Sequence, residues 1–402
     1  MEVKPEIETF AKIKIIGIGG GGGSALNRMV DSEIKGVEFI SINTDVQALH
    51  YSKASKKLHI GKTVTKGLGA GMDPEMGFKA AEESQNEIRE ALKDADMVFL
   101  TCGLGGGTGS GCAPVVADIA RELGALTVAV VTKPFSFEGA QRKVIADQAW
   151  EKLSDKVDTI ITIQNDRLLQ IIDKQTSLLE AFDIVDDVLR NAVQGISELV
   201  TVPGLINVDF ADVRSIMYEQ GTALMGMGEA SGENRAVEAA KAAISSPLLE
   251  LSMEGARGVL FIVSGGQDLS MHEVNEAAKV ITASADSEAK IIFGAIVDEN
   301  LGDKVKLTVI ATGFSDTPVK SRESEVKSSL NKEEEETYKP SNFLVKESIK
   351  EEEEKDKDKT KAKESEPQKS DKEDYKVPAS GKKEDNDDED LDIPAFIRKK
   401  MM

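Results

Sequence analysis

Cysteine, histidine and aromatic residues are scarce in this chain. Its 402 residues include two cysteines, three histidines and one tryptophan, and only 4% are aromatic, whereas 40% are hydrophobic. Two cysteines cannot build a disulfide framework, and three histidines without ligand spacing argue against a structural zinc site. We therefore expect aliphatic cores, enough for two packed domains, in which Cys102 and Cys112 are small buried hydrophobes.

Clustered basic charge and long apolar runs are also missing. The formal net charge of -21 argues against nucleic-acid binding, which needs clustered lysine and arginine side chains to neutralise phosphates. No apolar run reaches the length of a membrane span, and the first residues lack the basic and apolar regions of a signal peptide. We expect a cytoplasmic protein that binds no nucleic acid and does not insert into a membrane.

Glycine, by contrast, is concentrated in two turns. The segments 17–24 (GIGGGGGS) and 103–111 (GLGGGTGSG) each follow an apolar run and precede a helical pattern. Turns without Cβ atoms let backbone N–H groups approach an anion, and the following helix adds the positive end of its dipole. Thr108 and Ser110 add hydroxyl groups that a merely flexible loop would not need. Two such turns in one domain predict a polyphosphate site, with magnesium as the accompanying metal.

Short β-branched runs alternate with helical patterns in the first half of the chain. The runs are residues 12–17, 37–42, 97–101, 126–132 and 159–163, and stretches such as 74–94 and 140–153 favour helices. This alternation predicts an α/β fold with a doubly wound, mostly parallel sheet whose ligands bind at the carboxyl ends of the strands. Both glycine turns follow strands, so they belong at that edge.

A long helix and a second, smaller α/β domain are predicted to follow. Residues 177–200 carry apolar side chains in three- and four-residue steps until Pro203-Gly204 ends the pattern. Beyond it, 233–244 and 273–284 are typical of helices, whereas 258–263, 290–297 and 304–311 are typical of strands. From 317 to 390 the chain is too highly charged to bury a core, which predicts a disordered tail.

The first turn alone also fits a different function. Gly17, Gly19 and Gly22 match the dinucleotide fingerprint, and Asp45 ends the second strand where a ribose-binding acid belongs. A dinucleotide-dependent oxidoreductase, however, needs one pyrophosphate loop and a hydride or proton-donor site, and none stands out in the second half. The segment 61–63 (GKT) lacks the upstream glycine of a P-loop, so phosphate binding is attributed to backbone amides and helix dipoles.

Several segments together resemble the FtsZ family of bacterial cell-division GTPases, within the tubulin superfamily. Residues 105–111 (GGGTGSG) match the superfamily signature, and 43–45 (NTD), 67–71 (GLGAG) and 207–213 (NVDFADV) match the FtsZ family more narrowly. The match extends over about 12–313 and resumes at the C-terminal peptide. It implies GTP and GDP as ligands, Mg²⁺ bound with the nucleotide, polymerisation-dependent hydrolysis of GTP, head-to-tail protofilaments, and a cytokinetic ring at midcell.

The resemblance also divides the chain. It implies a flexible N-terminus (1–11), a GTP-binding domain (12–176), a central helix (177–202), an activation domain (203–316), a charged linker (317–390) and a docking peptide (391–402). Residues 391–400 (LDIPAFIRKK) join apolar to basic side chains, and Pro394 suits the first turn of a helix formed on binding. The family docks membrane anchors such as FtsA, and other division regulators, through this peptide.

Residue by residue, the resemblance implies a nucleotide site without a protein metal ligand. Glu138 and Arg142 correspond to ribose and base-edge contacts, Asn165 to a guanine contact and Asp186 to the acid that recognises guanine. A carboxylate accepts from N1–H and N2–H of guanine and repels N1 of adenine, which favours GTP over ATP. The remaining nucleotide-binding positions are Gly20, Gly21, Gly22, Gly23, Ser24, Asn43, Gly71, Gly106, Gly107, Thr108 and Gly109, with Ser24 standing where many relatives have Asn.

The acids that the resemblance assigns to catalysis lie far along the chain from this site. Asp209 and Asp212, with Asn207, would orient and polarise the attacking water. The sixteen residues from Asp186 to Val202 span about 24 Å as a helix. One subunit cannot bring both groups to one nucleotide, so the next subunit must supply the acids and the assembly must be an open filament. These acids would also suit a solvated turn or a helix cap. A GTP-binding scaffold that does not hydrolyse remains the alternative, because the sequence shows the acids but not their rate.

Overall fold

The computed structural model describes residues 11–169, 176–202, 204–246 and 253–314. The docking peptide (391–402), the charged linker (317–390) and all but the last residue of the expected flexible N-terminus lie outside these ranges. None of the described helices is long and apolar enough to cross a membrane.

The first subdomain is built on a parallel sheet. Its spatial order is β3-β2-β1-β4-β5-β6, and every neighbouring pair is parallel. The predicted doubly wound sheet is confirmed, but the sequence pattern misses β3, an edge strand whose four residues KKLH carry one apolar side chain. The strands are β1 (Ile13–Ile18), β2 (Val37–Asn43), β3 (Lys56–His59), β4 (Met97–Gly103), β5 (Leu126–Lys133) and β6 (Thr159–Gln164).

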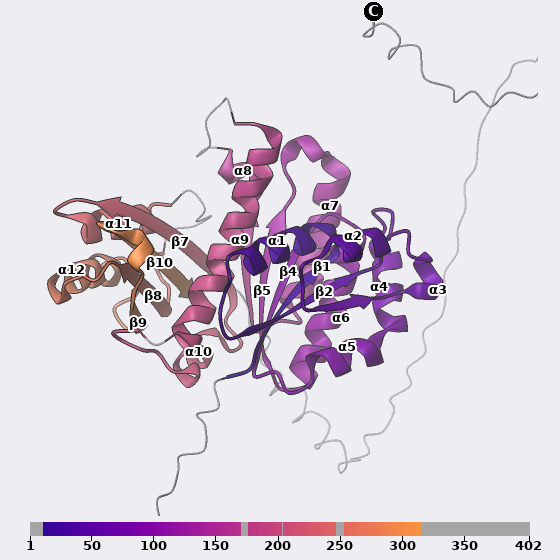
Figure 1. The fold of residues 1–402 in the computed structure, drawn as a ribbon, viewed down its shortest axis with the longest axis horizontal. Helices are drawn as coiled ribbons and strands as arrows, with labels where there is room; N and C mark the ends of the chain where they lie inside the picture. The colour runs from indigo at the N-terminus through magenta and orange to yellow at the C-terminus, as the bar shows by residue number, and fades with distance from the viewer. Residues whose placement is uncertain (1–10, 170–175, 203, 247–252, 315–402) are drawn as a thin grey trace, which may run out of the picture. The chain divides into compact units, whose positions relative to one another are not determined.

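Helices cover both faces of this sheet (Figure 1). Phe99 and Leu100 are adjacent on β4 and belong to the two opposite apolar clusters, as the period of a strand requires. One cluster includes α1 (Gly19–Asp31), α9 (Leu178–Thr201) and α10 (Phe210–Met217); the other includes α4 (Pro74–Glu83), α5 (Gln85–Leu92), α6 (Thr108–Glu122) and α7 (Ala140–Ser154). The shorter elements are α2 (Val46–Tyr51), α3 (Lys62–Thr65), η1 (Ser136–Glu138) and α8 (Asn165–Leu168).

Two sequence expectations in this subdomain can be compared directly with the structure. The helix predicted over 74–94 is broken at Ser84, whose buried hydroxyl accepts a hydrogen bond from the Gly61 N–H at 3.2 Å. The burial predicted for Cys102 and Cys112 is confirmed, since both are 0% exposed, and burial raises the pKa of the Cys102 thiol to about 12.

The second subdomain has a mixed sheet in the order β7-β10-β8-β9. Only β8 and β9 are parallel, and β7 continues the first sheet through three parallel pairs with β6. The sequence pattern misses β7 because its glycines and methionines interrupt any alternation. Gly228 is needed there, since a Cβ would lie 2.1 Å from the Ala239 oxygen of α11. The elements are β7 (Gly221–Ser231), α11 (Arg235–Ile244), β8 (Gly258–Gly265), α12 (Met271–Thr282), β9 (Lys290–Val297), η2 (Glu299–Leu301) and β10 (Lys304–Thr312).

Helix α9 packs against both sheets and lies between them (Figure 1). Its buried Val193 and Ile196 share one apolar cluster with Phe99 of the first sheet and with Ile262 of the second. The helix begins at a capping box, in which the Ser177 hydroxyl accepts from the Glu180 N–H at 3.2 Å. The predicted central helix is thus continuous from Leu178 to Thr201 and packs against both subdomains.

Candidate functional site

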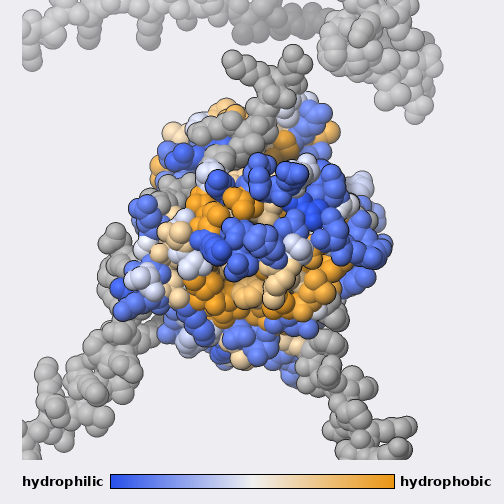
Figure 2. All heavy atoms as spheres, turned by 90° about the vertical axis from the view of Figure 1, so that its left-hand side faces the viewer, coloured by the Kyte–Doolittle hydropathy of each residue, from blue (hydrophilic) through white to orange (hydrophobic). Residues whose placement is uncertain are grey.

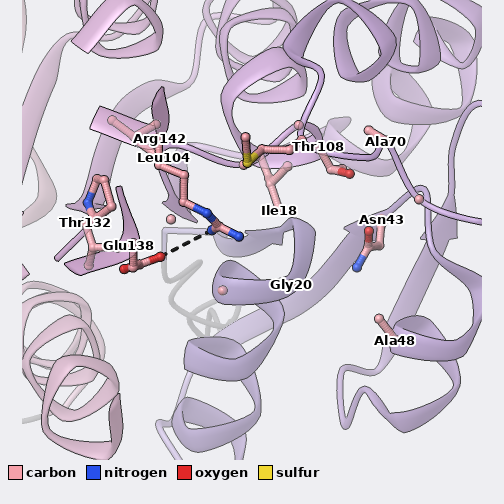
Figure 3. A pocket seen from close by; sticks show the side chains of 18 of the residues that line it. Ile18, Gly20, Asn43, Ala48, Ala70, Leu104, Thr108, Thr132, Glu138 and Arg142 are labelled. Atoms are coloured by element: carbon pink, nitrogen blue, oxygen red, sulfur yellow. Dashed lines mark hydrogen bonds and ion pairs between the residues drawn. The ribbon is translucent and has the colours of Figure 1, made fainter. Parts of the chain in front are cut away.

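A cavity of about 560 Å³ lies at the carboxyl ends of the parallel strands. Segments that follow β1, β2, β4, β5 and β6 all contribute to its lining, which is the edge at which the sequence predicts a ligand. Figure 3 shows Arg142 and Glu138 on one side of the cavity and Asn43 and Ala48 on the other. Of the nucleotide-binding positions expected from the sequence, the lining includes Gly20, Gly21, Asn43, Gly71, Gly106, Gly107, Thr108, Gly109, Glu138, Arg142, Asn165 and Asp186.

The cavity wall has the properties of an anion site made from backbone. Helices α1 and α6 both begin at it, so their N–H groups and positive dipole ends face the cavity. A Cβ built on Gly20 or Gly106 would meet no protein atom within 4 Å, so protein packing does not require glycine there. A side chain at these positions would instead take up space beside the backbone that a phosphate group could occupy.

Charged side chains do not explain anion binding. Among the described residues, the lining contains one cation, Arg142, and three carboxyl groups, those of Asp45, Glu138 and Asp186. Lys62, of the segment that superficially resembles a P-loop, is ion-paired with Glu87 at 3.1 Å and does not line the cavity. Phosphates in this cavity would therefore be held by backbone amides.

The first glycine turn becomes helical earlier than the sequence suggests. Helix α1 starts at Gly19, so Gly22, Gly23 and Ser24 lie within it and do not line the cavity. Gly22 has a packing role, because a Cβ there would lie 2.3 Å from the Thr101 oxygen of β4. Helix α1 can therefore lie directly on the sheet, which brings its first turn to the cavity.

The two hydroxyl groups of the second turn have protein partners. Thr108 Oγ1 lies 2.7 Å from Oγ1 of Thr44, a buried residue that joins the loop after β2 to the start of α6. Ser110 Oγ accepts from the Gly105 N–H at 2.9 Å and is 2% exposed, so it holds the turn and does not face the cavity. Thr44 was not singled out from the sequence, although it stands inside the motif 43–45.

Asn165 and Asp186 provide acceptors at the other end of the cavity. Asn165 is 5% exposed, and its Oδ1 is buried without a hydrogen-bond partner among the described residues. A buried acceptor without a donor costs free energy that a bound donor recovers. Phe182, one helical turn before Asp186, adds an apolar ring to the lining that the sequence reading missed. Guanine, with N–H donors on an aromatic ring, fits this combination.

Burial changes the acidity of Asp186. The pKa of this carboxyl is raised to about 6, mainly by desolvation; Arg28 of α1 opposes the shift, and the neighbouring Asp187 adds to it. The Arg28 Nε lies 3.5 Å from Asp186 Oδ2, and the same guanidinium also pairs with Asp183 and Asp187. Sequence reasoning missed Arg28, because only the packing of α1 on α9 brings it to these acids.

This acidity predicts that guanine-nucleotide affinity depends on pH. A carboxylate must be ionised to accept from both donors of guanine, so a guanine contact at Asp186 would be complete above the raised pKa and would weaken as the pH falls through about 6. We expect the apparent Kd for GTP to rise toward about tenfold per pH unit below that point. Fluorescence titrations with a labelled GTP between pH 7.5 and 5 would measure this dependence. An Asp186→Asn variant, titrated at higher nucleotide concentrations, should show none of it.

Three remaining side chains at the cavity are held by neighbours. The Arg142 Nη1 lies 3.3 Å from Glu138 Oε2, and Glu138 Oε1 accepts from the Phe135 N–H at 3.0 Å. Asp45 caps α2 by accepting from the Gln47 N–H at 2.8 Å. The helix cap accounts for an acid at position 45 without a ribose contact. One argument for the dinucleotide alternative is therefore removed.

Asn207, Asp209 and Asp212 do not line the cavity. They belong to the loop between α9 and α10 and to the first turn of α10. Phe210 and Arg214 of α10 line a second recess with residues 11–12, 94–96 and 123–124, which precede β1, β4 and β5. The acids therefore lie at the amino-end edge of the sheet, whereas the cavity lies at its carboxyl-end edge.

Comparison with known proteins identifies similar domains and folds. The model of the tubulin/FtsZ family GTPase domain matches residues 12–173, and that of the FtsZ family C-terminal domain matches residues 221–315. FtsZ of M. jannaschii, solved as an empty dimer, is 47% identical, with a TM-score of 0.74 over 76% of this chain and 89% of its own. CetZ1 of Haloferax volcanii, solved as a GDP-bound monomer, shares the fold at 23% identity and a TM-score of 0.67, over 76% of this chain and 96% of its own.

Proposed function

This chain belongs to the tubulin/FtsZ family of GTPases, and on that premise we propose that it polymerises head to tail and hydrolyses GTP at sites shared between adjacent copies. The separation of Asp212 from the nucleotide cavity carries the proposal. Helix α9 alone has 24 residues, about 36 Å at the usual rise, and Asp186 lies in its first half. A second copy stacked in the same direction would bring its own Asp212 to the first copy's cavity.

In this proposal each wall of the cavity has a chemical task. Asp186 and Asn165 accept from guanine, and the two glycine turns donate backbone N–H groups to the phosphates. Asp212 of the next subunit polarises the water that attacks the γ-phosphate. The described residues contain no group of three or more His, Cys, Asp or Glu that could hold a metal ion. Phosphate oxygens of the nucleotide would supply the ligands of Mg²⁺, and the cation would neutralise charge that develops during transfer.

Exposed apolar side chains near both ends of the proposed contact support it. Leu68 is 85% exposed next to the lining residue Gly69, and Phe137 is 61% exposed next to Glu138. Leu205, in the loop that carries the acids, is 64% exposed. Figure 2 looks onto a different side, that of α11, α12 and β9, where orange hydrophobic areas lie among blue ones; this side is neither end of the proposed contact. Large apolar side chains exposed near both faces suit an interface between copies.

The proposal includes a role in cell division. The M. jannaschii relative was solved as a dimer, and a filament of this chain would form the cytokinetic ring at midcell, as the resemblance to bacterial FtsZ implies. Residues 391–402, outside the described structure, would attach the filament to a membrane anchor such as FtsA.

Steady-state phosphate release against protein concentration tests the shared site. With GTP and magnesium, we expect little turnover below a threshold concentration and a steep rise above it, in step with light scattering. ATP is the control, and it should give neither turnover nor scattering. Turnover that is linear in protein from zero, without scattering, would contradict a shared site. Tight GTP binding with no turnover at any concentration would favour the non-hydrolysing scaffold.

A further inference from the structure

Asp209 and Asp212 differ in what their carboxyl groups do. Asp209 is the N-cap of α10: its backbone is extended (φ -81, ψ 162), and its Oδ1 accepts from the Asp212 N–H at 2.8 Å. The Asp212 side chain is half-buried and makes no hydrogen bond or ion pair within the described residues. One carboxylate is therefore used inside the subunit, while the other is available to a substrate.

The chain before Asp209 is fixed in a similar way. Asn207 Oδ1 accepts from the Gly204 N–H at 2.6 Å, which closes a tight turn after α9. Ile206 forms an antiparallel bridge with Ala295 of β9, in which the Ala295 N–H donates to the Ile206 oxygen at 3.1 Å. Gly204 permits this approach, because a Cβ there would lie 2.5 Å from the Ala295 oxygen. The loop is thus attached to the edge of the second sheet.

The chain after Asp212 is fixed by burial. Val213, Ile216 and Met217 of α10 are at most 2% exposed and belong to the apolar cluster that also contains α9. Helix α10 has only eight residues, so its first turn depends on the cap more than that of a long helix would. Asp212 lies in that first turn. Its position is therefore set by a buried helix on one side and by the Asp209 cap on the other.

We propose that Asp209 and Asn207 are positioning residues, and that Asp212 is the acid that acts on the water. The inference rests on the proposed shared site, in which this loop meets the nucleotide of the adjacent subunit. The inference gives different roles to two acids that the sequence pattern alone does not distinguish. The negative charge of Asp209 is not required for hydrolysis, whereas a hydrogen-bond acceptor at its side chain is required.

Three substitutions at one position test the requirement. Asn and Ser cap helices about as well as Asp, and Ala does not. We expect Asp209→Asn and Asp209→Ser to hydrolyse GTP within about threefold of the parent rate, and Asp209→Ala to lose roughly tenfold in kcat. GTP affinity of the isolated subunit should be unchanged in all three. Ser270→Ala is the matched control, because it removes the N-cap of α12, where Ser270 Oγ accepts from the Glu273 N–H at 3.2 Å.

The outcomes separate this inference from the proposed function. Asp209→Asn and Asp209→Ser variants as inactive as Asp212→Asn would show that the Asp209 charge acts directly and would overturn the inference. An Asp209→Ala variant with the full rate would also overturn it. If Asp212→Asn hydrolyses GTP like the parent, the proposed function fails instead. If Asp209→Ala does not fold, two variants of Asn207 test the same idea. Asn207→Asp keeps the oxygen that accepts from the Gly204 N–H, whereas Asn207→Ala removes it, so only Asn207→Ala should lower kcat.

Discussion

Replacement of Asp212 by Asn is expected to reduce GTP hydrolysis by roughly a thousandfold, while GTP binding stays at the level of the parent chain. The amide is nearly isosteric with the carboxylate, and its N–H₂ group cannot accept a proton from water. Asp212 lies at the opposite edge of the sheet from the cavity, so nucleotide affinity in the isolated subunit should not change. Single-turnover phosphate release and equilibrium binding of a labelled GTP would measure the two effects separately.

Mixing two inactive variants makes this prediction sharper. Asp212→Asn subunits keep a complete cavity, and Asp186→Ala subunits keep a complete Asp212 loop. When a subunit of the second kind lies next to the cavity of the first, one functional site is restored. In an equimolar mixture about a quarter of random contacts have that order, so up to about a quarter of the parent activity should return. Two variants that stay inactive when mixed, yet assemble together, would contradict the shared site. Loss of GTP binding in Asp212→Asn alone would contradict it as well.

The sequence predicts the frame of the nucleotide cavity because glycine and strand patterns are local. The positions after β1 and β4 are set by the alternation of strands and helices, and Gly20, Gly106 and Gly107 lie on the cavity wall as expected. Strand β7 could not be predicted in the same way. Its glycine at position 228 is explained only by the close approach of α11, which is a tertiary contact.

Contacts between distant segments account for most of what the sequence left open. Ser110 looks like a ligand donor in the sequence, yet its hydroxyl is taken by the Gly105 N–H. Arg28 looks like a surface cation on α1, and the packing of that helix on α9 brings it to Asp186. Asp209 and Asp212 have the same side chain three residues apart, and only the backbone conformation at Asp209 distinguishes cap from free acid. Residue types predict which chemical groups a site can contain. The hydrogen-bond and ion-pair partners, which only the folded structure shows, determine which of those groups can contact a ligand.

An Asp186→Asn variant is expected to exchange guanine for xanthine specificity. In the proposed contact, guanine would present two donors, N1–H and the 2-amino group, to the carboxylate. An Asn side chain can accept from N1–H, but its amide N–H₂ group then faces a second donor. Xanthine carries an oxygen in place of the 2-amino group, so it pairs with both halves of the amide and is repelled by the carboxylate. We expect GTP affinity to fall by roughly a hundredfold, and XTP affinity to rise by a similar factor relative to the parent.

Competition binding of GTP, XTP and ATP to the parent and the variant would measure the exchange. Asp187→Asn is the matched control, because it removes a neighbouring negative charge that also lies near Arg28. The Asp187 side chain is 46% exposed and does not line the cavity. This control should keep GTP specificity, because the charge around Arg28 changes while the base contact does not. Equal loss of GTP and XTP binding in Asp186→Asn would mean that the carboxylate supports the fold of α9 and does not contact the base. In the shared-site proposal, the catalytic loop comes from another subunit and is intact in Asp186→Asn. This variant, inactive with GTP, should therefore release phosphate from XTP in a concentration-dependent way. That result would show that base recognition and catalysis depend on separate faces of the protein.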